Sequence, residues 1–304
     1  VKVLKTVSNC PFDCSYCFLQ NYLNDGKLSA IGDLDAVIEE VKEKLEAQPW
    51  RFFRIGTWEL GDSLALEKMT GQAEYLIKAF RTLPNAVLEL KTKSDCVDTI
   101  LDLDHQQKTV VSWSMNTDTI IRKQEHKTAS LEDRLSAIKK VSDAGYLLGF
   151  HFDPMIDYPN AAAEYDDLVD AIFSRVPISQ VAWISMGSLR FNPEMKHKME
   201  ENFPASVLTA AEMSLGPDKK LRYPKPTRLA MYDALYKKLL TYNAHESLIY
   251  LCMERWDVWE HVMGYSPTSI GHLDFLFAES MKKRYPHLVL NTPDQTLYER
   301  YQDT

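Results

Sequence analysis

The chain has no long apolar run, no excess of positive charge and no even set of cysteines. No uninterrupted apolar stretch approaches about 18 residues, which argues against a membrane span. No secretion signal is visible either. The formal net charge of −8 over 304 residues argues against broad, sequence-blind binding of nucleic acid. With no internal repeat or low-complexity segment, the sequence is typical of a soluble globular protein.

The cysteine count limits the redox chemistry of the fold. Five cysteines cannot all pair, and a chain of 304 residues needs no disulfides to stabilise its core. We therefore expect free thiols in a reducing compartment and predict a cytoplasmic protein. The sequence starts at Val1, without methionine, and enters a strand-like segment at once. We accordingly expect an N-terminal segment to be missing or trimmed.

Three of the cysteines stand together at Cys10, Cys14 and Cys17, after the apolar segment 1–7. Three thiolates on one tight loop can hold three irons of a [4Fe-4S] cluster and leave the fourth iron open to a ligand. A zinc site would need a fourth ligand, and His105 and the other cysteines are remote in sequence. The spacing therefore favours an iron–sulfur cluster over a zinc site or plain thiols.

Strand-like runs alternate regularly with helical patterns. The expected strands are 1–7, 51–58, 86–91, 109–115, 146–152 and 180–186, and the expected helices between them are 33–47, 64–80, 96–103, 131–144 and 163–173. Six such units predict an α/β fold with a parallel sheet curled into a partial (β/α)6 TIM-like barrel. We expect three segments: the barrel with the cysteine loop (1–200), a segment with a basic loop (201–253), and a helical, aromatic extension that packs against the barrel (254–304).

Polar residues follow every expected strand. They are Cys10 after the first, Glu59 and Asp62 after the second, Lys93 after the third, Ser114 and Asn116 at the fourth, His151 and Asp153 at the fifth, and Ser188 and Arg190 after the sixth. Each alone is typical of a cap or a solvated loop residue. Active sites of such barrels form at the carboxyl ends of the strands, so the whole set indicates an active site.

The loop Cys-Pro-Phe-Asp-Cys-Ser-Tyr-Cys (10–17) resembles the signature of radical S-adenosylmethionine enzymes. From this loop to about Met253 the chain resembles the spore photoproduct lyase family. The likeness runs through Cys-Phe-Leu-Gln (17–20), Leu-Lys-Thr-Lys-Ser (90–94), Trp-Ser-Met-Asn (113–116), Asp-Arg-Leu-Ser-Ala-Ile-Lys-Lys-Val (133–141) and Ala-Gly-Tyr-Leu-Leu-Gly-Phe (144–150).

The resemblance implies a radical SAM barrel in which Cys10, Cys14 and Cys17 hold a [4Fe-4S] cluster. It implies that S-adenosylmethionine chelates the open iron and is cleaved to a 5′-deoxyadenosyl radical, for repair of a modified pyrimidine in DNA. An external electron donor such as flavodoxin or ferredoxin is implied as well. By matching position, the expected contacts of S-adenosylmethionine are Tyr16, Lys93, Ser114 and Asn116, with Glu59 and Asp62 beside them at the rim. Core packing is the alternative for Tyr16.

Two positions depart from the family's founding type. A tyrosine there follows the last cysteine and helps to pass the radical, whereas this chain has Phe18. Glu59 stands in the place of a hydrogen-donating cysteine, and a carboxylate cannot return a hydrogen atom. Either another donor substitutes, or the radical is regenerated from deoxyadenosine, or the reaction differs.

Two free cysteines are the candidate substitutes. Cys252 lies in the strand-like run 248–254, which we expect to be a further strand reaching the barrel mouth, with Tyr250 on the same face. We take Cys252 and Tyr250 as catalytic candidates, against the alternative of a small buried apolar residue. Cys96 ranks below Cys252, although it would begin the helix expected at 96–103.

The remaining candidates concern the substrate. The basic residues Lys219, Lys220 and Arg222 stand where the founding type has a DNA-binding hairpin, but a solvated loop before a helix at 228–240 explains them equally well. We also expect His151, Asp153 and Arg190 to bind substrate, or to hold the barrel mouth together by hydrogen bonds. Two other functions stay open: radical modification of RNA, a peptide or a small metabolite, and a cluster-containing sensor without turnover.

Overall fold

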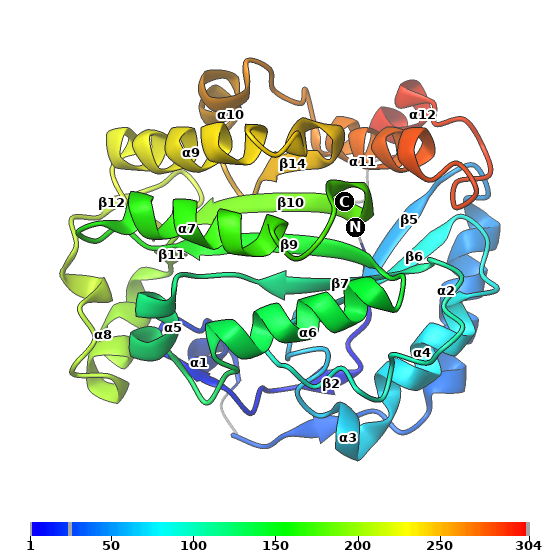
Figure 1. Ribbon diagram of the computed structural model, residues 1–304, viewed down its shortest axis with the longest axis horizontal. Coiled ribbons are helices and arrows are strands. Elements are labelled where there is room, and N and C mark those ends of the chain that lie inside the picture. Colours follow the sequence, from blue (N-terminus) through cyan, green and yellow to red (C-terminus); the bar gives the residue numbers. More distant parts are fainter. Residues whose placement is uncertain (1, 24–25, 302–304) are drawn as a thin grey trace.

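The computed structural model describes residues 2–23 and 26–301 and is built on one curled parallel sheet (Figure 1). Seven strands lie in the order β1-β5-β6-β7-β9-β10-β14, and all neighbouring pairs are parallel. Their bounds are β1 Lys2–Val3, β5 Phe53–Gly56, β6 Ala86–Thr92, β7 Thr109–Ser114, β9 Leu147–Met155, β10 Val181–Ser188 and β14 Leu248–Leu251. The predicted partial barrel is confirmed, and β14 is the further strand expected after residue 247.

The alternation of side chains along each strand separates two environments. On β6, Leu88 and Leu90 are fully buried in the core between the sheet and its helices, whereas Glu89 faces the inside of the curled sheet. On β9, Leu148 and Phe150 join the same core and His151 points inward. The period of two therefore places the polar residues of the central strands inside the barrel.

Helices cover the outer face of the sheet, with α6, α7 and α9 lying across it in Figure 1. Their starts carry ordinary caps, since Asp33 accepts a hydrogen bond from Ala36 N and Ser130 accepts one from Asp133 N. The helices of this layer are α2 Leu34–Ala47, α3 Glu67–Thr70, α4 Gln72–Phe80, α6 Leu131–Asp143, α7 Ala161–Phe173, α9 Lys225–Leu240 and α10 Trp256–Met263.

Shorter elements complete the chain around the mouth of the barrel. The hairpin strands β12 Ser214–Leu215 and β13 Leu221–Arg222 form a small sheet with β11 Arg190–Phe191. The others are β2 Val7–Ser8, β3 Asp13–Cys14, α1 Leu19–Tyr22, β4 Ser29–Ala30, α5 Asp118–Gln124, β8 Glu125–His126, α8 Pro193–Asn202 and three short 3₁₀ turns at Ile178–Gln180, Leu208–Ala210 and Ala244–Glu246.

Three local predictions differ from the structure. The first strand is only Lys2–Val3, since Val7–Ser8 pairs with β4 instead; Val1 lies outside the described residues. The helix expected at 64–80 is broken at Gly71, whose φ of 61° is left-handed. The helix expected at 96–103 is wrong. Its buried residues Val97 and Ile100 lie in successive turns, which suits a segment rich in aspartate and β-branched residues.

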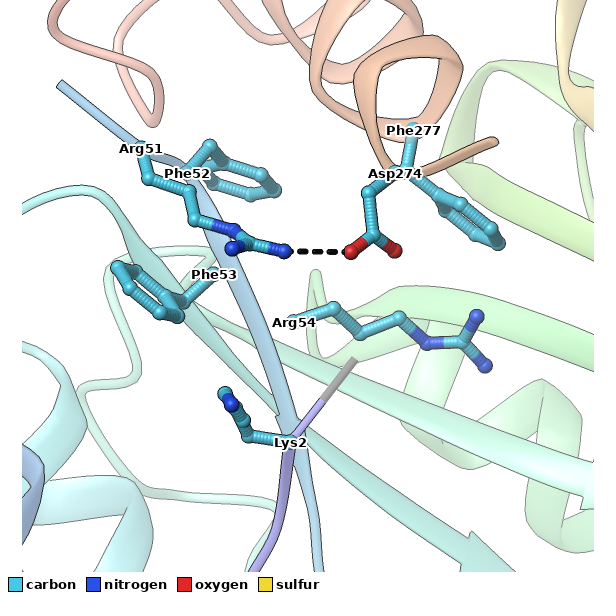
Figure 2. Close-up of a pocket in the computed structure, with 7 residues that line it drawn as sticks. All are labelled: Lys2, Arg51, Phe52, Phe53, Arg54, Asp274 and Phe277. Carbon is cyan, nitrogen blue, oxygen red and sulfur yellow. Dashed lines mark hydrogen bonds and ion pairs between the residues drawn. The ribbon is translucent and has the colours of Figure 1, made fainter. Parts of the chain in front are cut away.

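The C-terminal helices cover the end of the barrel at which the strands begin. Helices α11 Ile270–Arg284 and α12 Gln295–Arg300 pack on the first residues of the strands through Phe277, Met281 and Tyr298. Arg51 Nη2 lies 2.6 Å from Asp274 Oδ2, and Figure 2 shows Phe277 above β5 beside this pair. The predicted packing of the C-terminal extension against the barrel is confirmed. No helix among residues 2–23 and 26–301 is long and apolar enough to cross a membrane.

Candidate functional site

The cysteine loop lies at the carboxyl end of the parallel strands, and hydrogen bonds of its backbone hold it there. Asn9 adopts a left-handed φ of 73°, and its Oδ1 accepts a hydrogen bond from Cys10 N at 3.0 Å. Cys14 is fixed in β3 by its pairing with Glu125 of β8, and Cys17 N donates to Cys14 O at 3.0 Å. Three free thiols are thereby presented from one tight loop.

A second loop packs closely against the cysteines. A Cβ atom at Gly61 would lie 2.7 Å from Val7 Cγ2 and 2.8 Å from the carbonyl oxygen of Asn9. The approach of the loop after β5 to the cysteine loop therefore requires glycine. Glu59, in this second loop, is exposed.

Burial favours the neutral form of the three thiols, and the nearby Lys93 favours their thiolates. Burial raises the pKa of Cys10 to about 12 and raises the pKa of Cys14 and Cys17, and Lys93 opposes all three rises. Within residues 2–23 and 26–301, no three His, Cys, Asp or Glu side chains are placed to hold a single metal ion. A [4Fe-4S] cluster takes one thiolate on each of three irons, so it does not require three side chains around a single ion.

The backbone of Lys93 is held by Asp62, a residue that the sequence analysis predicted to lie beside the cofactor. Asp62 Oδ1 accepts hydrogen bonds from Leu64 N, Ala65 N and Thr92 Oγ1, and Asp62 Oδ2 accepts one from Lys93 N at 2.7 Å. Two of these donors, Thr92 Oγ1 and Lys93 N, tie the loop after β5 to the end of β6. The contacts observed for the Asp62 carboxylate are thus structural.

A buried ion pair orients the side chains around Lys93. The Lys93 Nζ lies 5.8 Å from the centre of the Tyr16 ring, and the Tyr16 hydroxyl donates to Glu125. Glu125 is paired with Arg134 at 2.6 Å, and both side chains are almost fully buried. Burial lowers the pKa of Lys93, but Glu125 and Cys14 raise it above its ordinary value. Glu125 and Arg134 escaped the sequence analysis, although Arg134 stands in one of the blocks shared with the family.

The two candidates on β7 behave differently. Ser114 ends the strand, and its carbonyl oxygen accepts from Arg134 Nη1 at 3.0 Å. The amide of Asn116 is already used inside the protein, since Nδ2 donates to Pro154 O at 3.0 Å and Oδ1 accepts from the Tyr165 hydroxyl at 2.8 Å. Tyr16 and Lys93 thus lie together beside the cysteine loop, Ser114 is linked to them through Arg134 and Glu125, and Asn116 is buried.

The middle of the barrel is a polar layer centred on Glu89. This carboxylate has no solvent exposure, and Arg54 forms a two-pronged ion pair with it at 2.8 and 3.0 Å. Its other donors are Trp58 Nε1, Ser112 Oγ, His151 Nε2 and Trp183 Nε1, at 2.9–3.0 Å. Arg54 and His151 hold the pKa of Glu89 well below its usual value, against the effect of burial.

His151 is therefore surrounded by protein groups. Its Nδ1 lies 2.6 Å from Ser185 Oγ, and its Nε2 lies 2.9 Å from Glu89 Oε1. Burial, with a contribution from Lys91, lowers the pKa of His151 to about 4. A neutral imidazole with its proton on Nε2 satisfies both neighbours.

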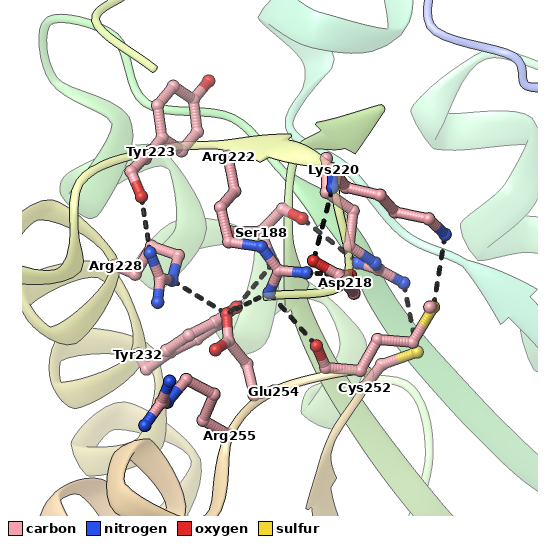
Figure 3. Close-up of polar contacts among 12 residues, drawn as sticks. Ser188, Asp218, Lys220, Arg222, Tyr223, Arg228, Tyr232, Cys252, Glu254 and Arg255 are labelled. Atoms are coloured by element: carbon pink, nitrogen blue, oxygen red, sulfur yellow. Dashed lines mark hydrogen bonds and ion pairs between the residues drawn. The ribbon is translucent and has the colours of Figure 1, made fainter. Parts of the chain in front are cut away.

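Asp153, Arg190 and Cys252 meet above the Glu89 layer (Figure 3 shows Cys252). The Arg190 guanidinium binds both oxygens of Asp153, at 3.0 and 3.1 Å, and Nη2 lies 3.3 Å from Cys252 Sγ. Burial and the charge of Asp153 raise the pKa of Cys252 to about 11, so this residue is a thiol at neutral pH. Tyr250 lies on the same face of β14, two residues before Cys252. Its hydroxyl accepts a hydrogen bond from Arg54 Nη2 at 3.2 Å.

The basic hairpin divides into an inner and an outer part (Figure 3). Arg222 is buried, ion-paired with Asp218, and donates to Met253 O at 3.2 Å. Beneath it, Glu254 accepts from Arg228 at 2.9 Å and from Tyr232 at 3.0 Å. Lys219 is exposed and Lys220 is half-buried. The inner arginines thus hold the turn after Cys252, and the two lysines are the part of the hairpin that solvent reaches.

The chain is similar in sequence to known proteins. The family model "Spore photoproduct lyase" matches residues 3–249. Spore photoproduct lyase of Clostridium acetobutylicum is 26% identical over 206 residues, which cover 67% of this chain and 61% of that protein. Spore photoproduct lyase of Bacillus subtilis is 25% identical over 244 residues, covering 79% and 69%.

Solved structures share the fold. A spore photoproduct lyase complexed with dinucleoside spore photoproduct matches with a TM-score of 0.73 and 21% identity, covering 82% of this chain and 75% of that one. Streptococcus suis SuiB bound to S-adenosylmethionine matches with a TM-score of 0.53 and 13% identity, covering 91% and 56%. Because the family model spans most of the described barrel, the chain belongs to the spore photoproduct lyase family.

Proposed function

We propose that this protein is a radical S-adenosylmethionine enzyme that repairs a modified pyrimidine lesion in DNA. The observation that carries the proposal is the loop of three free, partly or fully buried cysteines facing Lys93, in a chain of the spore photoproduct lyase family. A structure of that lyase holds AdoMet and dinucleoside spore photoproduct, which supports the same cofactor and substrate class here.

In this proposal Cys10, Cys14 and Cys17 hold a [4Fe-4S] cluster, and Lys93 and Ser114 bind the carboxylate and amino groups of S-adenosylmethionine. When bound, the cluster supplies an open iron and the electron that releases a 5′-deoxyadenosyl radical from S-adenosylmethionine. Lys93 contributes a charge-assisted hydrogen bond, and Tyr16 gives the adenine a flat apolar surface. The exposed Glu59 and the braced Asp62 stay proposed contacts at the edge of this site.

We propose that Cys252 returns the hydrogen atom that the product radical needs. The argument is that its sulfur stays protonated at neutral pH and is held by Arg190 at the barrel mouth. The S–H bond breaks, its hydrogen atom passes to the product carbon, and an unpaired electron stays on sulfur. The Tyr250 hydroxyl, on the same face of β14, would then return a hydrogen atom to the sulfur, which restores the thiol and leaves the unpaired electron on the tyrosine oxygen. His151, Asp153 and Arg190 would then shape the floor of the substrate site.

The test uses anaerobically reconstituted protein with S-adenosylmethionine, a reductant and irradiated DNA. The proposal predicts 5′-deoxyadenosine together with a loss of photoproducts. Undamaged DNA and irradiated RNA serve as matched controls. Deoxyadenosine without any change in irradiated DNA would contradict DNA repair.

A second candidate is radical modification of RNA, a peptide or a small metabolite. The burial of Arg222 favours keeping it, because it leaves fewer cations on the hairpin for a phosphate backbone than the sequence suggested. Phe18 and Glu59, which replace a radical-passing tyrosine and a hydrogen-donating cysteine, point the same way.

The remaining proposals concern the setting of the enzyme. Phe18 and Tyr22, 44% and 67% exposed next to the last cysteine, offer an apolar contact for an external electron donor such as flavodoxin or ferredoxin. The five free cysteines support a cytoplasmic location. We propose segments 1–200, 201–253 and 254–304 as the radical-generating, substrate-facing and barrel-closing parts of the chain.

A further inference from the structure

Lys91 occupies the inside of the barrel between the Glu89 layer and Lys93. It lies on β6 two residues from each of them and therefore on the same inward face, and it pairs in register with Ser112 of β7. Its Nζ lies 5.5 Å from the centre of the Trp58 ring. Lys91 as a whole residue is half-buried.

The inner cations around Lys91 are neutralised, whereas Lys91 is not. Arg54 is paired with Glu89 at 2.7 Å and Arg190 with Asp153 at 3.0 Å. Among the residues that the structure describes, no carboxylate lies within ion-pair distance of Lys91 Nζ and no group accepts a hydrogen bond from it. An ammonium group in this position has lost part of its water without gaining a partner.

The surroundings leave net positive charge at the mouth. Lys91 is within electrostatic reach of Lys93, Asp153 and Cys252, and Lys220 is within reach of Arg190 and the same cysteine. The nearby carboxylates are already paired, Asp153 with Arg190, Glu89 with Arg54 and Asp218 with Arg222, and Cys252 is neutral as a thiol. Partly enclosed positive charge of this kind attracts an anion strongly, because the local dielectric constant is low.

We propose that Lys91 and Lys220 form a subsite for a phosphate group of the substrate, with Arg190 adding its charge. The inference rests on the proposed function and deepens it, because it assigns to this site a substrate that carries a phosphate next to the reacting group. Lys91 donates hydrogen bonds to the phosphate oxygens from below, while Trp58 restricts the path of its side chain. Lys220 would approach the phosphate from the hairpin, beside the turn after Cys252, where its Nζ lies 4.0 Å from Met253 Sδ.

The test compares Lys91→Met, which keeps the length of the side chain and its packing on Trp58, with the matched control Lys68→Met at an exposed position on α3. Two probes are titrated without reductant: spore photoproduct as the dinucleotide, with its phosphodiester, and as the dinucleoside, without it. The wild type and the control should bind the dinucleotide about tenfold more tightly than the dinucleoside. Lys91→Met should lose this difference and keep its affinity for the dinucleoside. Equal affinity for the two probes in the wild type would overturn the subsite.

Inorganic pyrophosphate provides a third probe that does not depend on a DNA lesion. If its binding is lost in Lys91→Met and restored in Lys91→Arg, the subsite holds even where neither photoproduct probe binds and the DNA proposal fails. If pyrophosphate binds the wild type and Lys91→Met equally, the subsite is wrong. Because the substitution removes an unpaired, partly buried charge, the melting temperature of Lys91→Met should equal or exceed that of the wild type, which separates a binding effect from misfolding.

Discussion

At the scale of single residues, Glu89 is the centre of the polar network inside the barrel. One buried carboxylate collects hydrogen bonds or ion pairs from five side chains on four strands and one loop. Such a network is costly when one member is left unsatisfied. We therefore regard Glu89, Arg54 and His151 as the frame that keeps the mouth in shape, and Cys252, above it, as the hydrogen donor that we propose.

The lowered pKa of His151 predicts an acid-sensitive fold. Its pKa is about 4 in the folded protein, against about 6.5 for an unperturbed histidine. The unfolded state therefore binds more protons between these values, and the free energy of unfolding should fall as pH falls from about 6.5 to 4, by on the order of 3 kcal/mol. Urea unfolding at several pH values measures this. In His151→Gln the slope over that window should flatten; an unchanged slope would contradict the assignment.

Replacement of Cys252 tests the proposed hydrogen donor. In Cys252→Ala we expect product formation to fall at least about tenfold, which is about 1.4 kcal/mol in the barrier, because the proposed hydrogen donor is lost. Deoxyadenosine formation should persist, since Cys252 does not hold the cluster. Cys96→Ala is the matched control. Full turnover by Cys252→Ala would remove Cys252 from the mechanism.

At the scale of elements, the hairpin β12–β13 has two faces with different duties. Arg222 points inward to the turn that follows Cys252, where it faces the almost fully buried Glu254. Lys219 sits on the outer turn with a left-handed φ of 61°. The sequence treats these basic residues as one group, and the fold separates them.

Two substitutions in the hairpin should therefore act differently. Arg222→Met breaks a buried set of charged contacts, so it should lower the free energy of unfolding by about 3 kcal/mol. Lys219→Ala should change stability by less than about 0.5 kcal/mol and should instead weaken the binding of DNA and its dependence on salt. Urea unfolding and DNA titration at two salt concentrations distinguish them. A stability loss of similar size in both variants would show that the division is wrong.

Helix α11 acts as a plug for the end of the barrel at which the strands begin. Phe277 is buried between Trp183 and Tyr250, with ring centres 6.0 and 5.0 Å away. Phe277→Ala should cost about 3–5 kcal/mol through the cavity it leaves. Leu290→Ala, at a position 62% exposed, is the control and should be nearly neutral. Thermal unfolding measures both, and equal melting temperatures would argue against a plug.

At the scale of the whole molecule, local patterns predict the barrel well. The alternation of apolar runs with helical periodicity locates the strands, and the cysteine spacing locates the loop. Contacts between distant segments are not visible in such patterns. Examples are the pairing of Cys14 with Glu125, the brace from Asp62 to Lys93 and the inward turn of Arg222. Lys91 did leave a signal, because a charged residue between Leu90 and Thr92 in a buried strand must face a polar interior.

The central claim is that this chain uses S-adenosylmethionine to take a hydrogen atom from damaged DNA. The most direct measurement is mass analysis of the 5′-deoxyadenosine formed with irradiated DNA whose thymine bases carry deuterium. The account predicts deuterium in the deoxyadenosine, in step with the loss of photoproduct. Deoxyadenosine that contains no deuterium, formed at the same rate with undamaged DNA, would contradict it.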